Sequence, residues 1–130
     1  MKLTKQGDYA IRAVVELAKH YSGGLCSAKD IAFQQKIPVS FLPKILSLLT
    51  KNGIILSQRG SSGGIRLAKS PPEITLSSIV EAVEGPFILN DCLGDATLCE
   101  RKGQCKVHEI WFKAQNAMLK ELNITLDTLI

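Results

Sequence analysis

The chain has 130 residues, of which 45% are hydrophobic and 22% charged, and its formal net charge is +4. This length is typical of one domain, and no run of residues approaches the ~20 apolar positions that a membrane span needs. The first residues carry no apolar secretion signal, so we expect a cytoplasmic protein with reduced thiols and no membrane association.

The charge is unevenly distributed along the chain. Residues 1–70 contain 11 Lys and Arg against 3 Asp and Glu, a net charge of +8, whereas residues 71–130 contain 5 against 9, a net charge of −4. A basic half suits nucleic acid, whose phosphates dominate non-specific affinity. The same asymmetry also arises on an ordinary solvated face, so charge alone leaves both interpretations open.

The first predicted helix runs from about Thr4 to His20. Apolar residues recur there at the spacing of a core-facing helical stripe, at Ile11, Val14, Val15 and Ala18. The Ser22–Gly24 segment is expected to end this helix.

Two shorter helices follow. Ser27 is expected to cap a helix over Ala28–Gln35, and Ser40 a helix over Phe41–Asn52 with Pro43 in its first turn, where the missing amide hydrogen costs little. Two short helices joined by a tight turn predict a helix-turn-helix.

A hairpin is predicted next. The apolar runs Ile54–Leu56 and Ile65–Leu67 flank a glycine-rich segment, Ser57–Gly64, which suits a flexible tip. This tip is not a phosphate-binding loop, because no Gly-Lys-Ser/Thr follows and no helix begins there. The predicted fold is therefore mainly α with a small β-hairpin wing: a winged helix-turn-helix.

The second half predicts a helix from about Ile74 to Gly85 and a long helix over Val107–Leu122. The long helix has a broad apolar side, formed by Ile110, Trp111, Ala114, Ala117, Met118 and Leu122. That side needs a partner, which is either a second copy of the chain, the first helix, or both. We divide the chain into a DNA-binding domain (1–85), a cysteine-rich cluster-binding loop (86–106), and a dimerisation helix with a C-terminal segment (107–130).

The loop contains the pattern Cys92-x6-Cys99-x5-Cys105-x2-His108 in a segment with almost no hydrophobic periodicity. Thiolates and imidazole are ligands of zinc and of iron–sulfur clusters, and the residues alone leave the two about equal. Closed zinc sites usually have closely spaced cysteine pairs, which are missing here. Cys26 is expected to be a small buried residue and not a ligand.

Several short motifs occur in a specific order along the chain. They are Met1-Lys2-Leu3-Thr4, Tyr9-Ala10, Arg12-Ala13, Ile37-Pro38-Val39-Ser40-Phe41-Leu42, Lys51-Asn52-Gly53, Arg59-Gly60-Ser61-Ser62-Gly63-Gly64, Ile74-Thr75-Leu76, Glu81-Ala82-Val83-Glu84-Gly85 and the three-cysteine loop. Together they make the chain resemble the Rrf-two superfamily of bacterial winged-helix regulators over nearly its whole length.

The resemblance implies a homodimer that binds a palindrome-like double-stranded DNA operator and carries an iron–sulfur cluster on Cys92, Cys99 and Cys105. In IscR-like members a histidine matched by His108 completes a 2Fe–2S site. In NsrR-like members an aspartate of the other subunit, matched by Asp8, completes a 4Fe–4S site. Both residues are present, and Asp8 with 4Fe–4S is slightly favoured because IscR-like chains usually lack an acid there.

A recognition helix enters the major groove with its N-terminal residues near base edges. Our candidates for reading bases are Ser40, Lys44 and Ser47, and Arg59 is the candidate for insertion into the minor groove. The expected phosphate contacts are Ser61, Ser62, Lys51 and Arg66. Pro43 replaces a polar base-reading residue of IscR-like members, so the operator cannot be transferred from them.

These features predict a transcriptional regulator, expected to be a repressor, that senses nitric oxide, iron, redox state or cluster status. The alternative is a cluster-free winged-helix regulator with structural zinc or thiol-redox cysteines. An enzyme is disfavoured because the sequence has neither a Cys-x-x-Cys pair nor a nucleophile with an evident base.

Overall fold

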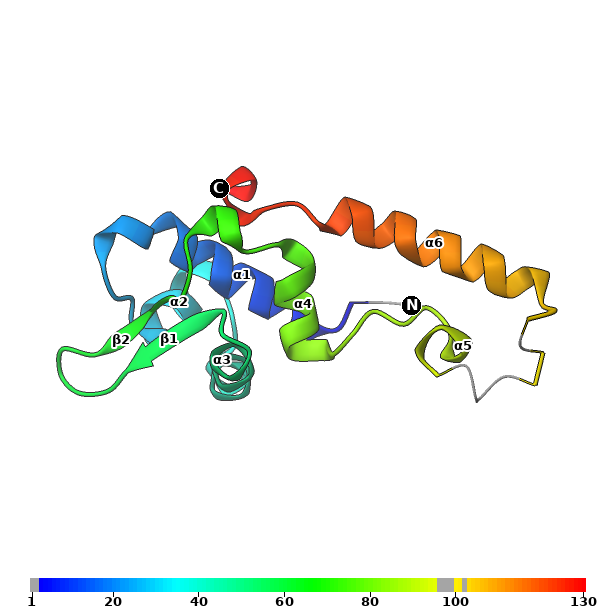
Figure 1. The fold of residues 1–130 in the computed structure, drawn as a ribbon. Coiled ribbons are helices and arrows are strands. Elements are labelled where there is room, and N and C mark those ends of the chain that lie inside the picture. The colour runs from blue at the N-terminus through cyan, green and yellow to red at the C-terminus, as the bar shows by residue number, and fades with distance from the viewer. Residues whose placement is uncertain (1–2, 96–99, 102) are drawn as a thin grey trace.

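The computed structural model describes residues 3–95, 100–101 and 103–130. Figure 1 shows a group of helices with a hairpin at one side and a long helix projecting from the other. The regular elements are α1 (Lys5–Lys19), α2 (Ala28–Gln35), α3 (Leu42–Lys51), β1 (Ile55–Gln58), β2 (Gly64–Leu67), α4 (Leu76–Glu84), α5 (Asp91–Gly94) and α6 (Lys106–Leu122). Short 3-10 turns lie at Tyr21–Gly23, Val39–Phe41, Pro71–Glu73 and Leu126–Leu129. The predicted fold, mainly helical with a hairpin wing, is confirmed.

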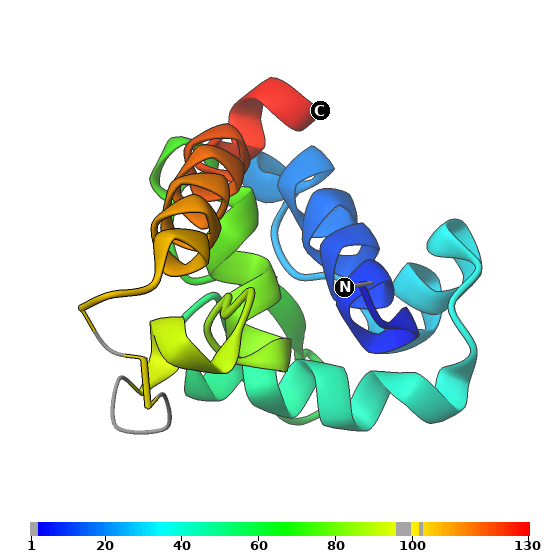
Figure 2. The same cartoon turned by 90° about the vertical axis from the view of Figure 1, so that its right-hand side faces the viewer.

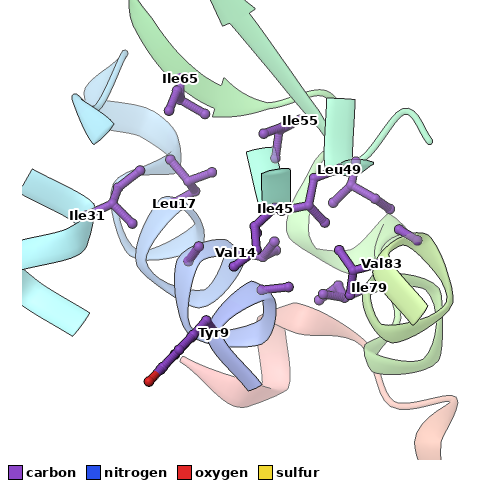
Figure 3. Close-up of a cluster of buried hydrophobic side chains, with 14 of the residues drawn as sticks. Tyr9, Val14, Leu17, Ile31, Ile45, Leu49, Ile55, Ile65, Ile79 and Val83 are labelled. Atoms are coloured by element: carbon purple, nitrogen blue, oxygen red, sulfur yellow. The ribbon is translucent and has the colours of Figure 1, made fainter. Parts of the chain in front are cut away.

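One hydrophobic core joins α1 to α4 and the hairpin (Figure 3). Each element contributes fully buried side chains, among them Val14, Ile31, Ile45, Ile55 and Ile79. Burying each such side chain contributes about 2 kcal/mol, so these residues hold α3 and the hairpin in a fixed relation.

α1 is buried along a slightly different stripe from the predicted one. Val14 and Ala18 are buried as predicted, but Ile11 and Val15 are only partly buried. The alanines Ala10 and Ala13 are fully buried instead. Small side chains there allow α2, α3 and α4 to approach α1 closely, which the periodicity of large residues could not indicate.

The helix-turn-helix consists of α2 and α3. The Ser27 hydroxyl accepts a hydrogen bond from the Asp30 amide at 3.1 Å, which confirms the predicted cap. Lys36 ends α2 in the left-handed region, with φ 54°. The predicted cap at Ser40 is wrong, because Ser40 lies inside the turn Val39–Phe41 and makes no capping bond.

Ser40 does not cap α3 because helical structure begins one residue before it, at Val39. The carbonyl of Pro38 accepts the first bond, from the Phe41 amide at 3.0 Å. α3 then follows directly from Leu42, with Pro43 in its first turn as predicted.

The wing consists of β1, β2 and the connecting residues 59–63. The strands pair antiparallel from Ile55 opposite Leu67 to Gln58 opposite Gly64. A third segment joins the sheet, because Cys26 and Ile65 exchange two backbone hydrogen bonds of 2.8 and 2.7 Å. The wing is therefore fixed to the start of the helix-turn-helix.

α6 projects from this unit and has no buried residue. Only its last turns approach the unit, where Met118 and Leu122 line an apolar groove with Ile11 and Val80. Figure 2 shows α6 beside α4, with α2 at the opposite edge beyond α1. No described helix combines the length and apolar character needed to cross a membrane.

The chain after α6 returns to the winged-helix unit. Leu126 is fully buried, and its amide donates to the Ile74 carbonyl at 2.8 Å. The Leu76 amide donates to the Ile124 carbonyl at 2.9 Å. The C-terminal turn therefore packs with residues 1–85, and the proposed three-part division stays a prediction.

Candidate nucleic-acid interface and cysteine site

The outer face of α3 carries the polar residues that the sequence predicted to read DNA. Its inner face is fixed in the core by Leu42, Ile45 and Leu49, which are at most 3% exposed. The opposite positions are all exposed: Ser40, Lys44, Ser47 and Lys51. The structure therefore places these four predicted residues together on one solvent-facing surface.

The wing presents the other four candidates. Arg59, Ser61, Ser62 and Arg66 are exposed on its tip and on β2. The tip is shaped by glycine, because a side chain at Gly63 would collide with the backbone of Gln58 and Arg59. The tip contains a turn in which the Gly63 amide donates a hydrogen bond to the Gly60 carbonyl at 3.0 Å, and its predicted flexibility stays a prediction.

The surface formed by these elements is positive without local compensation. Residues 31–72 contain six Lys and Arg and no Asp or Glu. Lys44, Lys51, Arg59 and Arg66 form no ion pair with any residue that the structure describes. Such a surface attracts phosphate.

Sequence reasoning missed two further exposed lysines in the same acid-free stretch, of which Lys69 lies near the Glu73 carboxylate. Lys36, at the end of α2, and Lys69, after β2, are also exposed. The acid-free stretch from residue 31 to residue 72 was the signal that could have identified both.

The cysteine site brings two predicted ligands together. Cys92 lies in α5, whose first amide is bound by the Asn90 side chain at 2.9 Å, and His108 lies in the first turn of α6. The Nδ1 atom of His108 is 3.2 Å from the Sγ atom of Cys92, and both side chains are partly buried. Imidazole and thiol from two different helices therefore meet at one point.

The other two cysteines predicted as ligands are Cys105 and Cys99. Cys105 is partly buried at the residue just before α6, and Cys99 lies outside the described residues. Within the described part of the chain, no three His, Cys, Asp or Glu side chains are close enough to hold a metal ion. The structure thus contains a Cys92–His108 pair and leaves the other two cysteines unassigned.

Asp8 lies elsewhere, in the first turn of α1. Its carboxylate forms an ion pair with Arg12 at 2.8 Å. The Arg12 guanidinium also lies over the Tyr9 ring, 5.5 Å from its centre. Asp8 makes no hydrogen bond to Cys92 or His108 within this chain, so the chain by itself does not unite the two candidate fourth ligands.

Cys26 is separate from the cysteine loop. It is partly buried, and burial, together with the charges of Glu16 and Asp30, raises the pKa of its thiol. A raised pKa favours the protonated thiol, which is a poor metal ligand and a poor nucleophile.

Sequence reasoning also missed Glu16, the one buried charged residue in the described part of the chain, which is 7% exposed. Its carboxylate accepts a hydrogen bond from Gln35 of α2 at 2.5 Å and is 3.2 Å from His20. Burial opposes its ionisation, but the bonds to Gln35 and His20 and the charge of Lys19 lower the pKa of Glu16. Glu16 is therefore a charged link between α1 and α2.

A helix-turn-helix with an exposed basic second helix, followed by a hairpin, defines a winged-helix DNA-binding protein. Residues 3–130 match the Rrf2 family, described as "Iron-dependent Transcriptional regulator". The chain belongs to the Rrf2 family of transcriptional regulators.

Three similar proteins illustrate this relationship. The HTH-type transcriptional regulator IscR of Pectobacterium carotovorum is 35% identical over 131 residues, which cover 100% of this chain and 79% of the relative. The solved structure of T. potens IscR has a TM-score of 0.79 at 27% identity and covers 99% of this chain and 85% of its own. The structure of CymR, named as the global cysteine regulator of B. subtilis, has a TM-score of 0.76 at 28% identity, with coverages of 99% and 95%.

Proposed function

We propose that this transcriptional regulator is a repressor whose operator binding is controlled by an iron–sulfur cluster held by Cys92, Cys99, Cys105 and either His108 or Asp8. The observation that carries the proposal is the 3.2 Å approach of His108 to Cys92. The family description as iron-dependent supports it. The protein is expected to act in the cytoplasm, where thiols stay reduced.

The donor set fits a cluster. Three thiolates with one nitrogen or oxygen donor are soft ligands suited to iron–sulfur centres, and a ligand other than cysteine changes the cluster potential. When bound, the cluster supplies sensitivity to nitric oxide, iron supply, redox state or cluster status.

The two candidate fourth ligands have different requirements. His108 already contacts Cys92 within one chain, and it fits a 2Fe–2S site of the IscR-like kind. Asp8 fits the 4Fe–4S alternative, slightly favoured by the sequence, in which the aspartate comes from the partner subunit. In that alternative Asp8 would bind the cluster while one of its carboxylate oxygens is paired with Arg12 in this chain.

The protein is expected to act as a homodimer. α6 exposes Val107 (50%), Ile110 (60%), Trp111 (38%) and Phe112 (53%) and buries none of its residues. A helix of this kind needs a partner surface, and a second copy supplies one with two-fold symmetry. A two-fold dimer then matches a palindrome-like operator.

The position of the cysteine site suggests how a cluster would control DNA binding. Cys92 and His108 connect α5 to the start of α6, and the end of α6 approaches α4, which packs against α3. Cluster binding would order the cysteine loop and shift the two recognition helices of a dimer relative to each other. Equal operator affinity of the cluster-bound and cluster-free forms would contradict this mechanism.

The test is an anaerobic visible absorption spectrum with iron and sulfide assays on the wild type, Asp8→Ala and His108→Ala, with Cys26→Ala as the matched control. A 4Fe–4S spectrum perturbed by Asp8→Ala would assign Asp8. A 2Fe–2S spectrum that depends on His108 would assign His108. Cys26→Ala is expected to leave the spectrum unchanged.

A second candidate function is a cluster-free regulator that responds through its cysteines or uses structural zinc. The likeness to a protein named as a global cysteine regulator favours it. Colourless protein after anaerobic purification, with stoichiometric zinc or no metal, would support this candidate and overturn the cluster proposal.

A further inference from the structure

Exposed apolar residues at the start of the recognition helix include Val39 and Pro43, beside Pro38 and Phe41, whose ring packs edge-on against Tyr9. Val39, the first residue of the helical turn before α3, is 68% exposed. Pro43, in the first turn of α3, is also exposed. Neither side chain can donate or accept a hydrogen bond.

Neither residue is needed for the core. The residues that anchor this region are Ile37 and Leu42, which are 4% and 3% exposed. Val39 lies between these two anchors in sequence and points away from the core. An isolated exposed apolar residue is common, but here Val39 and Pro43 occupy one turn of the helix expected to face DNA.

Pro43 lies on the same helix face as the polar residues predicted to read bases. Ser40, Pro43 and Ser47 are spaced i, i+3 and i+7, so they share the outward face of the helix. Pro43 therefore interrupts a row of hydroxyl groups, and Val39 stands at the tip of the same helix. In a helix-turn-helix these N-terminal positions contact base edges.

We infer that Val39 and Pro43 form an apolar contact with the 5-methyl group of thymine in the operator and select thymine at those positions. This inference rests on the proposed binding of a specific operator. The thymine methyl is the one apolar group that a base pair presents in the major groove, and it is read by apolar side chains. The polar neighbours, Ser40 and Lys44, supply the adjacent hydrogen bonds.

The charge around the two residues favours DNA over a protein partner as their occupant. They lie within residues 31–72, which contain no acidic residue. Lys44 follows Pro43 directly, and it is exposed and forms no ion pair with a described residue. DNA offers phosphates to the lysine and methyl groups in the major groove to the two apolar side chains, so it matches both features of this surface.

The experiment begins with operators selected by the wild-type protein from random duplexes. Each thymine of the selected site is then replaced by uracil, which removes only the 5-methyl group and keeps every hydrogen-bonding group. We expect uracil at one position in each half-site to lower affinity about fourfold per methyl group.

The uracil scan is repeated with Val39→Ser, Pro43→Ala and, as a control, Phe33→Ser, which removes an 81% exposed apolar side chain from α2. Val39→Ser and Pro43→Ala should each bind the thymine operator more weakly than the wild type does. Replacing thymine by uracil should then reduce their affinity by a smaller factor than it does for the wild type, as expected when the side chain contacts the methyl group directly. Phe33→Ser should keep the full response to uracil. Circular dichroism confirms that the variants are folded.

The outcomes separate this inference from the proposed function. Failure to select any DNA sequence would overturn operator binding itself. Selective binding without a uracil penalty would overturn the methyl contact alone. If uracil lowered the affinity of both variants as much as that of the wild type, the contact of Val39 and Pro43 with the methyl group would also be excluded, because other residues would then contact it.

Discussion

Gly7 is a position in α1 where an ordinary helix-stabilising change should fail. The side chain of Glu84, at the end of α4, binds the amide and hydroxyl of Thr4, the residue that caps α1. A Cβ atom at Gly7 would collide with this carboxylate and with Leu3. The Glu84 carboxylate thus both stabilises the start of α1 and excludes larger residues.

We therefore predict that Gly7→Ala lowers the melting temperature, although alanine favours a helix by about 1 kcal/mol over glycine. Displacing the end of the Glu84 side chain should cost about 1.5–3 kcal/mol, because its carboxylate loses the hydrogen bonds from the Thr4 amide and hydroxyl. Thermal unfolding measures the effect. In a Glu84→Ala background the same change should become stabilising, and a loss of stability there would contradict the explanation.

Glu16 predicts a pH-dependent contribution to stability. Since the folded protein lowers the pKa of Glu16, its ionised form adds stability above the usual carboxyl pKa of about 4.3, and this stability is lost as the pH falls through the folded pKa. The wild type should therefore melt at a higher temperature than Glu16→Gln at pH 7, and the difference should shrink toward pH 3. A difference independent of pH would show that the charge of Glu16 is not involved.

At the scale of elements, the wing is fixed to the helix-turn-helix by the Cys26–Ile65 hydrogen bonds, so Arg59 has a defined position relative to α3. We predict that Arg59→Ala lowers operator affinity about tenfold at matched salt. Lys113→Ala, which removes the same charge from α6, is the control and should have a much smaller effect. Equal losses in the two variants would mean that only net charge matters.

Much of the winged helix could be predicted from the sequence, because its elements are defined by local signals. Ser27 and Lys36–Pro38 bound α2, and the predicted helix over Ala28–Gln35 is confirmed to the residue. Ser40 misled the prediction because the Pro38 carbonyl, a backbone group, begins the next helix. The burial of Ala10 and Ala13 depends on helices distant in sequence, which the pattern of large residues does not reveal.

The candidate sites were predictable to different degrees. The residues predicted to contact DNA follow from position on a helix or hairpin, and the exposure of all eight could be predicted from the sequence. Their contacts with DNA stay a prediction. The sequence of the cysteine loop has almost no hydrophobic periodicity, so it could propose ligands but not the distances between them. The meeting of Cys92 with His108 depends on how α5 lies against α6, which is a tertiary contact.

At the scale of the whole molecule, the exposed face of α6 predicts a dimer. Ile110→Glu should weaken dimerisation at least about a hundredfold, because burying an unpaired carboxylate costs about 3 kcal/mol or more. Sedimentation velocity measures the change, and operator binding should fall with it. Asn116→Glu adds the same charge at an exposed polar position of α6 and should leave the dimer intact. A dimeric Ile110→Glu variant would exclude this face as the interface.

The burial of Leu126 against Ile74 also has a consequence for how the protein is made. The core of the winged-helix unit lacks one of its fully buried side chains until Leu126 has been synthesised. Folding of the first 85 residues is therefore completed only after the cysteine loop and α6 have been synthesised. Every nascent chain that acquires a complete winged-helix core therefore already carries the segment proposed to regulate its DNA binding.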